Sequence, residues 1–394
     1  MTEAELREVV KAYGTPTYVF DEEAFRARIR AVKEAFGPDV SLCYSIKANP
    51  FLVPAAREEG MLLEVCSPGE LAICEHEGIE ASRIVYSGVC KQEDDVCEAL
   101  RYGVGVFTAE SPLQLELVNR EALAAGKCVP VLLRLSGKSQ FGMIKADLMS
   151  LVAKRDTFAG VELVGIHYFV GTQRRKLKRQ RAELTMLLKL ADELEDTYGW
   201  RPARLEYGPG LGFPYFTDED FSDTLAPARE LADDVREVAQ HIDLTVEMGR
   251  FFASECGSYL TRVVDLKAGF DLPYAFVDGG INHVNYLGQM MGMRQPQIRN
   301  LSADDGASRE LATWSLCGSL CTTADVLVRE IELALAPGDV LAFDNIGAYS
   351  VTEGVYLFLS RTMPRIVLHR EGGFVLARDF VETSALNVAG SSRG

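Results

Sequence analysis

The sequence predicts an α/β protein made of a (β/α)8 barrel (TIM barrel) and a second, mainly antiparallel β domain. Between residues 40 and 247, eight short runs of apolar and β-branched residues alternate with segments of helical spacing, a pattern typical of a parallel barrel. Polar residues follow most of these runs. Beyond about residue 260, strand-like runs continue with few long helices between them, which indicates a separate β domain.

The eight runs are the expected barrel strands: 40–47, 62–67, 83–87, 105–108, 129–135, 163–170, 204–207 and 244–247. Segments with helical spacing lie between most of them, at 69–77, 92–101, 112–125, 178–198 and 220–241. The carboxyl ends of all strands in such a barrel share one face. We therefore expect the polar residues at these ends to line a single pocket.

The second domain is expected to combine both ends of the chain. A short helix over 4–13, a strand over 15–20 and a helix over 21–36 come first, and the later strands are expected at 259–267, 274–278, 313–316, 340–343, 365–369 and 373–377. We expect the barrel to span 26–262. Residues 1–25 and 263–394 would form a β-sandwich or barrel-like domain, with 389–394 a disordered tail.

Composition excludes several classes of protein. A net charge of −16 at pH 7 argues against a nucleic-acid partner. No apolar run approaches transmembrane length, and the acidic first residues do not resemble a signal peptide, so we expect a cytoplasmic protein without a membrane partner. Nine scattered cysteines and five histidines favour reduced thiols and no metal site.

The first candidate for chemistry is Lys47, which ends the first apolar run within the sequence Tyr-Ser-Ile-Lys-Ala-Asn-Pro at 44–50. Pro50 then ends the strand and opens a helix. Burial depresses the pKa of an amine, and such an amine is a nucleophile that condenses with an aldehyde. The structural alternative is a lysine whose ammonium simply extends to the exposed end of the strand.

Two later motifs fit the same pocket. The turn 207–212, Tyr-Gly-Pro-Gly-Leu-Gly, follows a strand, and glycines allow backbone N–H groups to approach a phosphate. Glu247 ends the eighth run and could hold a proton on a cofactor ring nitrogen, while Arg250 suits a phosphate or carboxylate. Taken singly, the turn could be an ordinary tight turn and Glu247 an ordinary salt-bridge partner.

The second domain contributes two further candidates. Cys321 lies in the turn-rich segment 317–325, and Tyr349 follows a strand in Asp-Asn-Ile-Gly-Ala-Tyr at 344–349. Buried cysteines are usually inert, so neither segment is informative alone.

Together these motifs resemble the fold-type III decarboxylases that depend on pyridoxal phosphate (PLP), the group of diaminopimelate, ornithine and arginine decarboxylases with an alanine racemase-like barrel. The resemblance covers nearly the whole chain. It rests on six ordered motifs: Tyr-x-x-Lys-Ala-Asn at 44–49, His-x-x-x-Gly-Thr at 167–172, the turn at 208–212, Glu-x-Gly-Arg at 247–250, Gly-x-x-Cys at 318–321 and Gly-Ala-Tyr at 347–349.

The resemblance implies an enzyme that removes the α-carboxylate of an amino acid. Lys47 would carry PLP as a Schiff base, Glu247 would pair with its ring nitrogen, and Cys321 would reprotonate the product from the neighbouring subunit of a homodimer. Other cofactor contacts would be His167, Phe169, Gly208, Gly210, Gly249, Arg250 and Tyr349, and substrate contacts Arg134, Thr322 and Tyr349.

Three positions depart from the family pattern. Phe169 stands where most members have a second histidine, and an aromatic ring can still stack on the pyridine. Glu64 replaces an aspartate. Thr322 replaces an acidic residue that faces the distal amino group of the familiar substrates, so a simple diamine-forming substrate becomes less certain.

A basic run follows the sixth strand: residues 174–181, Arg-Arg-Lys-Leu-Lys-Arg-Gln-Arg, hold six cations in an acidic chain. Such runs are usually solvated helix faces. Here the run could instead meet a substrate with extra carboxylates or an acidic carrier protein. The turn 280–283 and the segment 286–294 are further candidates on the substrate side.

Several functions remain open from the sequence. The leading one is a diaminopimelate or ornithine decarboxylase-like enzyme, and the alternative is decarboxylation of a carboxylate-rich or carrier-linked amino acid in a biosynthetic pathway. An amino-acid racemase is disfavoured because racemases of this fold place an arginine, not Glu247, at the ring nitrogen. A catalytically inactive regulator would lack Lys47 or Cys321, and both are present.

Overall fold

The computed structural model describes residues 1–286, 292–303 and 308–390. The chain divides into two compact units, which we call the barrel unit (26–213 and 223–252) and the sheet unit (1–25, 214–222 and 253–394). Parts of the segment 286–294 and of the tail 389–394 lie outside the described residues.

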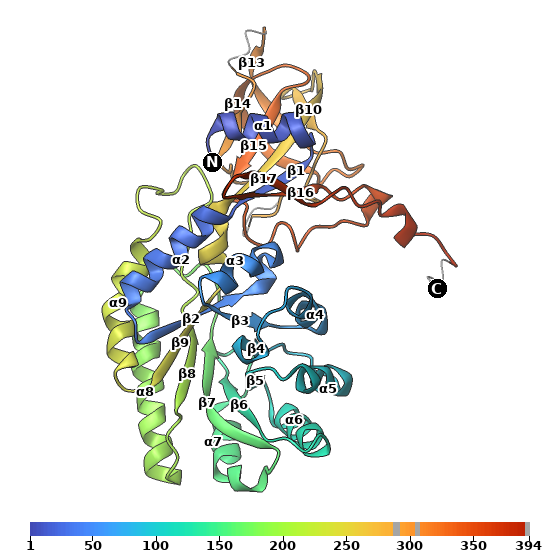
Figure 1. Ribbon diagram of the computed structural model, residues 1–394. Helices are drawn as coiled ribbons and strands as arrows, with labels where there is room; N and C mark the ends of the chain where they lie inside the picture. The colour runs from blue at the N-terminus through green and yellow to red at the C-terminus, as the bar shows by residue number, and fades with distance from the viewer. Residues whose placement is uncertain (287–291, 304–307, 391–394) are drawn as a thin grey trace. The chain divides into compact units, whose positions relative to one another are not determined.

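The barrel unit contains the eight parallel strands expected from the sequence, closed in chain order from β2 to β9 (Figure 1). Their bounds are β2 Val40–Ser45, β3 Leu62–Val65, β4 Ile84–Tyr86, β5 Val106–Ala109, β6 Val129–Leu135, β7 Val161–Phe169, β8 Arg204–Gly208 and β9 Asp243–Met248. Pairing of β9 with β2 closes the barrel, with Cys43 opposite Glu247.

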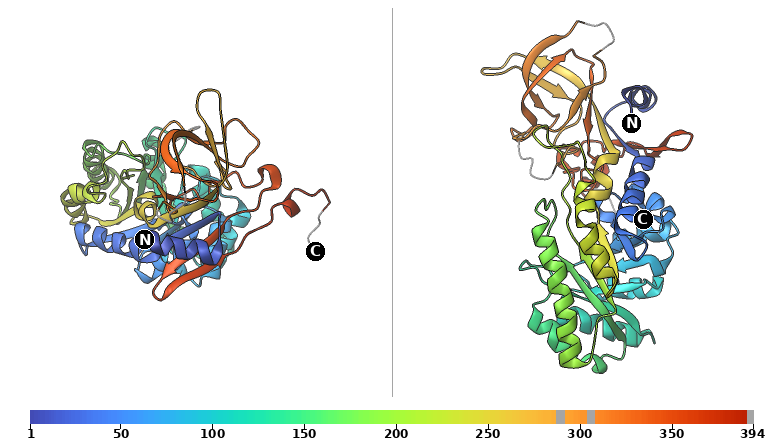
Figure 2. Two further views of the ribbon diagram at one scale, coloured as in Figure 1. Left: turned by 90° about the horizontal axis from the view of Figure 1, so that it is seen from above. Right: turned by 90° about the vertical axis from the view of Figure 1, so that its left-hand side faces the viewer.

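Helices connect the strands and cover the barrel (Figure 1). They are α2 Glu22–Phe36, α3 Val53–Glu58, α4 Pro68–His76, α5 Glu93–Tyr102, α6 Pro112–Ala124, α7 Lys145–Ala153, α8 Lys178–Tyr198, α9 Ala226–Ala239 and α10 Arg250–Ala253. In Figures 1 and 2, α8 and α9 lie side by side outside the strands.

Local sequence explains where several helices begin. Ser67 caps α4 and Ser111 caps α6, each by accepting a hydrogen bond from a backbone N–H in the first turn, and a proline occupies the first helical position of both. A serine cap followed by proline satisfies or removes backbone donors that have no partner within the helix.

The described residues of the sheet unit form nine strands, mainly antiparallel, in the order β14-β13-β11-β10-β1-β16-β17, with β15 paired to β10 and β12. Their bounds are β1 Thr17–Asp21, β10 Gly257–Lys267, β11 Tyr274–Val277, β12 Ile298–Asn300, β13 Glu310–Cys317, β14 Val326–Leu335, β15 Val340–Asp344, β16 Arg365–Arg370 and β17 Gly373–Arg378. Helix α1, Glu3–Tyr13, packs Leu6 and Val9 into a buried cluster with residues of this sheet.

The N-terminal strand joins the C-terminal domain, as expected. β1 pairs antiparallel with β10 and parallel with β16. The unit boundary lies after Phe252 rather than at residue 262, because β10 pairs with β1 and β15 and so belongs to the sheet. Strands β12 and β14 were not expected from the sequence.

Candidate active site

Lys47 lies just beyond the end of β2, in a single 3-10 turn of Ile46–Ala48, and not in the strand itself. Asn49 follows, and its side chain accepts a hydrogen bond from Phe51 N at the start of the next turn, where Pro50 is the first residue. The short turn therefore places the lysine side chain at the carboxyl end of the barrel strands, on the face where barrel active sites form.

The Lys47 amine lies beside a buried acid. Its Nζ donates to Glu64 Oε2 at 2.5 Å and lies 3.3 Å from Cys66 Sγ. The Lys47 side chain is 38% exposed, whereas Glu64 is 3% exposed. An incoming molecule can thus reach the amine, while Glu64 holds it at the end of β3.

Cys66 is a second, unexpected neighbour of this pair. Its thiol donates to Glu64 Oε1 at 3.0 Å. Burial, together with the negative charge of Glu64, raises the pKa of Cys66 well above its usual value. The thiol is therefore a neutral hydrogen-bond donor that helps to orient Glu64.

Glu247 lies near the end of β9 and is 5% exposed. His167 Nε2 is 2.8 Å from Glu247 Oε2, and Ser45 Oγ donates to Oε1 at 3.0 Å. Burial alone would raise the pKa of this carboxyl, but the hydrogen bond from His167 and the positive charges of Lys47 and Arg134 outweigh it and hold the pKa below its usual value. The structure thus keeps a buried, ionised carboxylate within the barrel.

The pKa of Glu206, in the middle of β8, is shifted in the opposite direction to that of Glu247. It is 3% exposed, and its Oε1 has no hydrogen-bond partner among the described residues. Burial and the nearby charge of Glu247 raise its pKa well above the usual value, which favours the protonated form. Ligand atoms of His167, Glu206 and Glu247 lie within 4.8 Å of one another, close enough for a metal ion. Since Glu247 already accepts hydrogen bonds from His167 and Ser45, we interpret the group as two neighbouring buried acids whose pKa values are shifted in opposite directions.

Glu206→Gln is expected to stabilise the protein at neutral and alkaline pH. A carboxyl whose folded pKa is raised contributes its stability below the unfolded pKa, and loses it as the pH rises through the folded pKa. An uncharged amide avoids this loss, so the difference in Tm between variant and wild type should grow from pH 4.5 to pH 8 in a thermal-denaturation series. A difference that is constant with pH would contradict a raised pKa.

The glycine-rich turn after β8 comes close to the segment after β7. A Cβ on Gly210 would lie 1.8 Å from Gly171 O, and the φ of Gly210 is +60°, so only glycine fits here. Arg174 N donates to Gly210 O at 2.8 Å. Gly208 lies against Phe169, whose Cδ2 would be 2.5 Å from an added Cβ.

The segment after β9 is equally close-packed. A Cβ on Gly249 would lie 2.9 Å from Ala48 Cβ and 3.1 Å from Ser45 O. The glycine therefore lets the end of β9 approach the turn that carries Lys47. Arg250, which is 6% exposed, donates from Nε to Thr172 Oγ1 at 3.3 Å, which links the ends of β9 and β7.

Arg134, in β6, is held by an ion pair rather than left open to a substrate. Its Nη1 donates to Glu110 Oε1 at 2.5 Å, and both side chains are buried. Glu110 Oε2 also accepts a hydrogen bond from Gly142 N. The guanidinium lies 5.1 Å from the centroid of Phe141 and 6.0 Å from that of Phe169, so it supports the aromatic ring expected to stack on the cofactor.

The remaining expected site residues lie in the sheet unit. Cys321 and Thr322 are exposed, and their turn is built around Asp325, whose carboxylate accepts hydrogen bonds from Ile281 N and Leu320 N. Tyr349 is half-buried with a φ of +69°, an uncommon conformation for a bulky residue.

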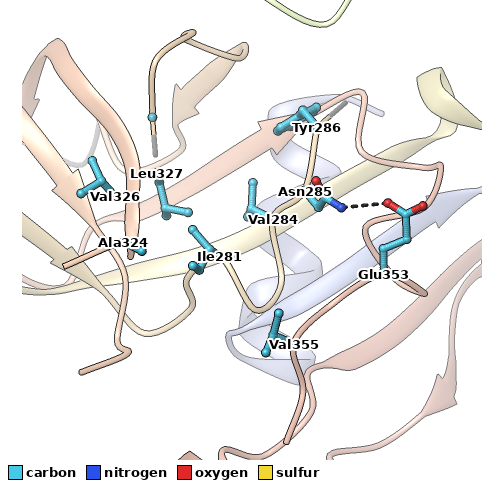
Figure 3. Close-up of a pocket in the computed structure, with 10 residues that line it drawn as sticks. Ile281, Val284, Asn285, Tyr286, Ala324, Val326, Leu327, Glu353 and Val355 are labelled. Atoms are coloured by element: carbon cyan, nitrogen blue, oxygen red, sulfur yellow. Dashed lines mark hydrogen bonds between the residues drawn. The ribbon is translucent and has the colours of Figure 1, made fainter. Parts of the chain in front are cut away.

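The sheet unit also contains a cavity of about 310 Å³. Figure 3 shows its mainly apolar lining, which includes Ile281, Val284, Val326, Leu327 and Val355. Its carboxylate, Glu353, accepts a hydrogen bond from Asn285 Nδ2 at 2.8 Å. The cavity lining thus includes part of the turn 280–283, whose His283 has its pKa lowered by burial to about 3 and is neutral.

Sequence reasoning missed Ser45, Cys66, Glu110 and Glu206 as parts of the site. The sequence did contain a signal for Glu110: it directly follows β5, and Glu247 likewise lies at the carboxyl end of its strand, one residue before the end of β9. Glu206 is the one acidic residue within the β8 run Arg-Leu-Glu-Tyr-Gly, and an acid in a buried strand calls for a partner or a proton.

Comparison with known proteins identifies the family. Residues 22–254 match the model of the pyridoxal-dependent decarboxylases, pyridoxal binding domain. The chain belongs to this family. Its relatives include the L-glutamyl-[BtrI acyl-carrier protein] decarboxylase of Niallia circulans, 28% identical over 96% of this chain and 94% of the relative. The diaminopimelate decarboxylase of Pseudomonas aeruginosa is 30% identical over 87% of this chain and 85% of the relative.

Solved structures share the fold. A crystal structure from Aquifex aeolicus has a TM-score of 0.85 and 27% identity, covering 96% of this chain and 92% of that one. Diaminopimelate decarboxylase from Methanocaldococcus jannaschii, solved with L-lysine, has the same TM-score and coverage at 24% identity. Both the barrel and the mainly antiparallel domain expected from the sequence are thus confirmed. No described helix is both long and apolar enough to span a bilayer.

The barrel-unit residues fit PLP. Lys47 offers a reachable amine, Glu247 a buried ionised acid, and the Gly210 turn a close backbone approach that a Cβ would block. These are the three groups that the aldehyde, the ring nitrogen and the phosphate of PLP require.

Proposed function

We propose that this enzyme removes the α-carboxylate of an amino acid, with PLP attached covalently to Lys47. The observation that carries the proposal is the position of Lys47, Glu247 and Gly210 at the ends of β2, β9 and β8, three strands that are consecutive around the closed barrel. One cofactor-sized molecule at this face would meet all three.

When bound, PLP supplies an electron sink for the electron pair left on Cα as CO₂ departs. Glu247 would hold a proton on the ring nitrogen, and His167 and Ser45 would fix the carboxylate in place. The backbone of 208–212, together with Arg250, would hold the phosphate. Phe169 would cover one face of the ring.

Cys321 would donate the proton that Cα needs after CO₂ has left. A thiol is a competent general acid, and Cys321 is exposed at a turn fixed by Asp325. We propose that it acts on the site of a partner subunit, with Thr322 and Tyr349 as neighbouring contacts. The functional unit would then be a homodimer with two shared sites.

Release of CO₂ across a substrate panel tests the reaction. The panel comprises meso-diaminopimelate, D- and L-ornithine, lysine, and amino acids linked to citrate or to a carrier protein. Racemisation without CO₂ release would overturn the proposal in favour of a racemase, while neither activity from the PLP-loaded protein would overturn it altogether.

Mixing two inactive variants is expected to restore activity. In a heterodimer of Lys47→Ala and Cys321→Ala, one site has both groups and the other has neither, so complete exchange should return about one quarter of wild-type activity. Exchange is checked independently with two size-tagged subunits. If subunits exchange and no activity returns, the shared-site model is wrong.

A second candidate function is decarboxylation of a carrier-linked amino acid. The relative from Niallia circulans is named for such a substrate and aligns with 96% of this chain. Two features of this chain favour the candidate: the uncharged Thr322, which offers no acid to a distal ammonium, and the basic run at 174–181. Glutamate loaded on the BtrI acyl-carrier protein is a suitable probe, with CO₂ release as the readout.

A further inference from the structure

The basic run divides into anchored and exposed cations. Arg174 forms two hydrogen bonds with the Glu183 carboxylate, at 2.5 and 2.8 Å, and its side chain is 13% exposed. Arg181 pairs with Asp234 at 3.0 Å. The other four are exposed, and we call them the rim cations: Arg175, Lys176, Lys178 and Arg179. Within the described part of the chain, Lys176, Lys178 and Arg179 form no ion pair.

The rim cations are in an unfavourable position for helix stability. Helix α8 begins at Lys178, its cap position Leu177 has no side-chain hydrogen bond, and its first turn contains no acidic residue. The N-terminus of a helix carries partial positive charge and favours anions. The cations also repel one another. None of the 57 acidic residues of the chain lies in this turn to offset that repulsion. Stability of α8 therefore does not explain the charges.

The rim begins directly beside the proposed phosphate turn, at Arg175. Arg174 N donates to Gly210 O, and residues 174 and 211 form an isolated bridge. The Arg175 side chain packs against Gly212, with its Cγ 3.0 Å from the place where a Cβ would stand. An anionic surface that binds the rim would thus be held next to the site.

We propose that the rim cations dock an acidic carrier protein, which presents the amino-acid substrate to the site. The inference rests on the proposed function in its carrier-linked form, and it specifies the docking surface and the point of attachment. A carrier protein is a macromolecule whose substrate hangs from a long flexible arm, so its own surface must bind outside the pocket. In an acidic enzyme, a local basic rim selects that contact.

The reaction also determines how the amino acid is attached. The α-amino group must be free to react with the cofactor, and the α-carboxylate must be free because the bond from it to Cα breaks. A carrier thioester can therefore use only a side-chain carboxyl, so the substrate is an acidic amino acid linked through its distal carboxyl. CO₂ leaves, a proton is added at Cα, and the thioester is unchanged.

The test is a double charge reversal, Lys178→Glu with Arg179→Glu. These two are chosen because Arg175 packs against Gly212 in the proposed phosphate turn and Lys176 directly follows Arg175 in the chain. Lys189→Glu, at an exposed position farther along α8, is the matched control. Two substrates are compared: glutamate thioesterified through its distal carboxyl to the BtrI acyl-carrier protein, and the same thioester on pantetheine alone.

We expect the double reversal to lower kcat/KM for the carrier-linked substrate about tenfold or more, and to weaken its salt dependence. The pantetheine thioester should be unaffected, and Lys189→Glu should behave as wild type with both. Carrier binding, followed by fluorescence anisotropy at low and high salt, should weaken in parallel. Because the new glutamates favour the helix N-terminus, Tm should hold or rise.

Different failures have different meanings. Equal losses with both substrates, or a lower Tm, would overturn docking in favour of a structural role. A wild-type protein that turns over both thioesters equally, with no salt effect, would also overturn it. A wild type that releases CO₂ from free amino acids but from neither thioester would refute the carrier inference and leave the decarboxylase proposal standing.

Discussion

Lys47→Ala is expected to yield a folded protein that binds no PLP covalently and decarboxylates roughly 10³-fold more slowly, or not at all. The amine is the group that would bond to the cofactor aldehyde. Its loss also leaves the buried Glu64 without a cation, which destabilises the protein by itself. Alanine alone therefore cannot separate chemistry from stability.

Lys47→Arg provides the separation. A guanidinium can keep the ion pair with Glu64 but is not a nucleophile for an aldehyde. We expect Lys47→Arg to recover the Tm lost in Lys47→Ala while remaining inactive. Borohydride reduction and peptide mapping of the wild type should mark Lys47, and a mark on any other lysine would refute the assignment.

Glu247→Gln is expected to keep PLP but to lower kcat on the order of 10²-fold, with little change in KM. The amide cannot supply the negative charge that holds a proton on the ring nitrogen, so the electron sink weakens. Near-normal turnover in Glu247→Gln would show that the carboxylate is only structural.

Ser45→Ala perturbs the same carboxylate more mildly than Glu247→Gln, because it removes one of the two hydrogen bonds to Glu247 and leaves the carboxylate itself in place. Loss of that bond destabilises the ionised form and raises the pKa of Glu247. In a plot of kcat against pH, the acid limb should therefore move to higher pH in Ser45→Ala. An unchanged acid limb would show that Ser45 has only a structural role.

Strand β6 and helix α8 have the bounds expected from the sequence, because a short, mainly apolar run and a helical repeat are local patterns. Strand β14 was missed for an equally local reason. Its middle, Arg329, Glu330 and Glu332, is charged and exposed, and it forms a strand because it pairs with β13. The strand propensity of the β14 residues does not include the free energy of pairing with a strand from elsewhere in the chain.

The sequence by itself determined the barrel, the added β domain and the strand-end positions of Lys47, His167 and Glu247. Periodicity and the rule that strand ends share a face need no partner information. Only the tertiary structure decided the charge states. Glu206 and Glu247 differ because His167 and Ser45 reach Glu247, while Glu206 Oε1 has no hydrogen-bond partner in the part of the chain that the structure describes. These contacts join β9 to β7 and to β2, which are separated by many residues in the chain. Because both acids are buried, the presence or absence of such partners sets the direction in which each pKa shifts.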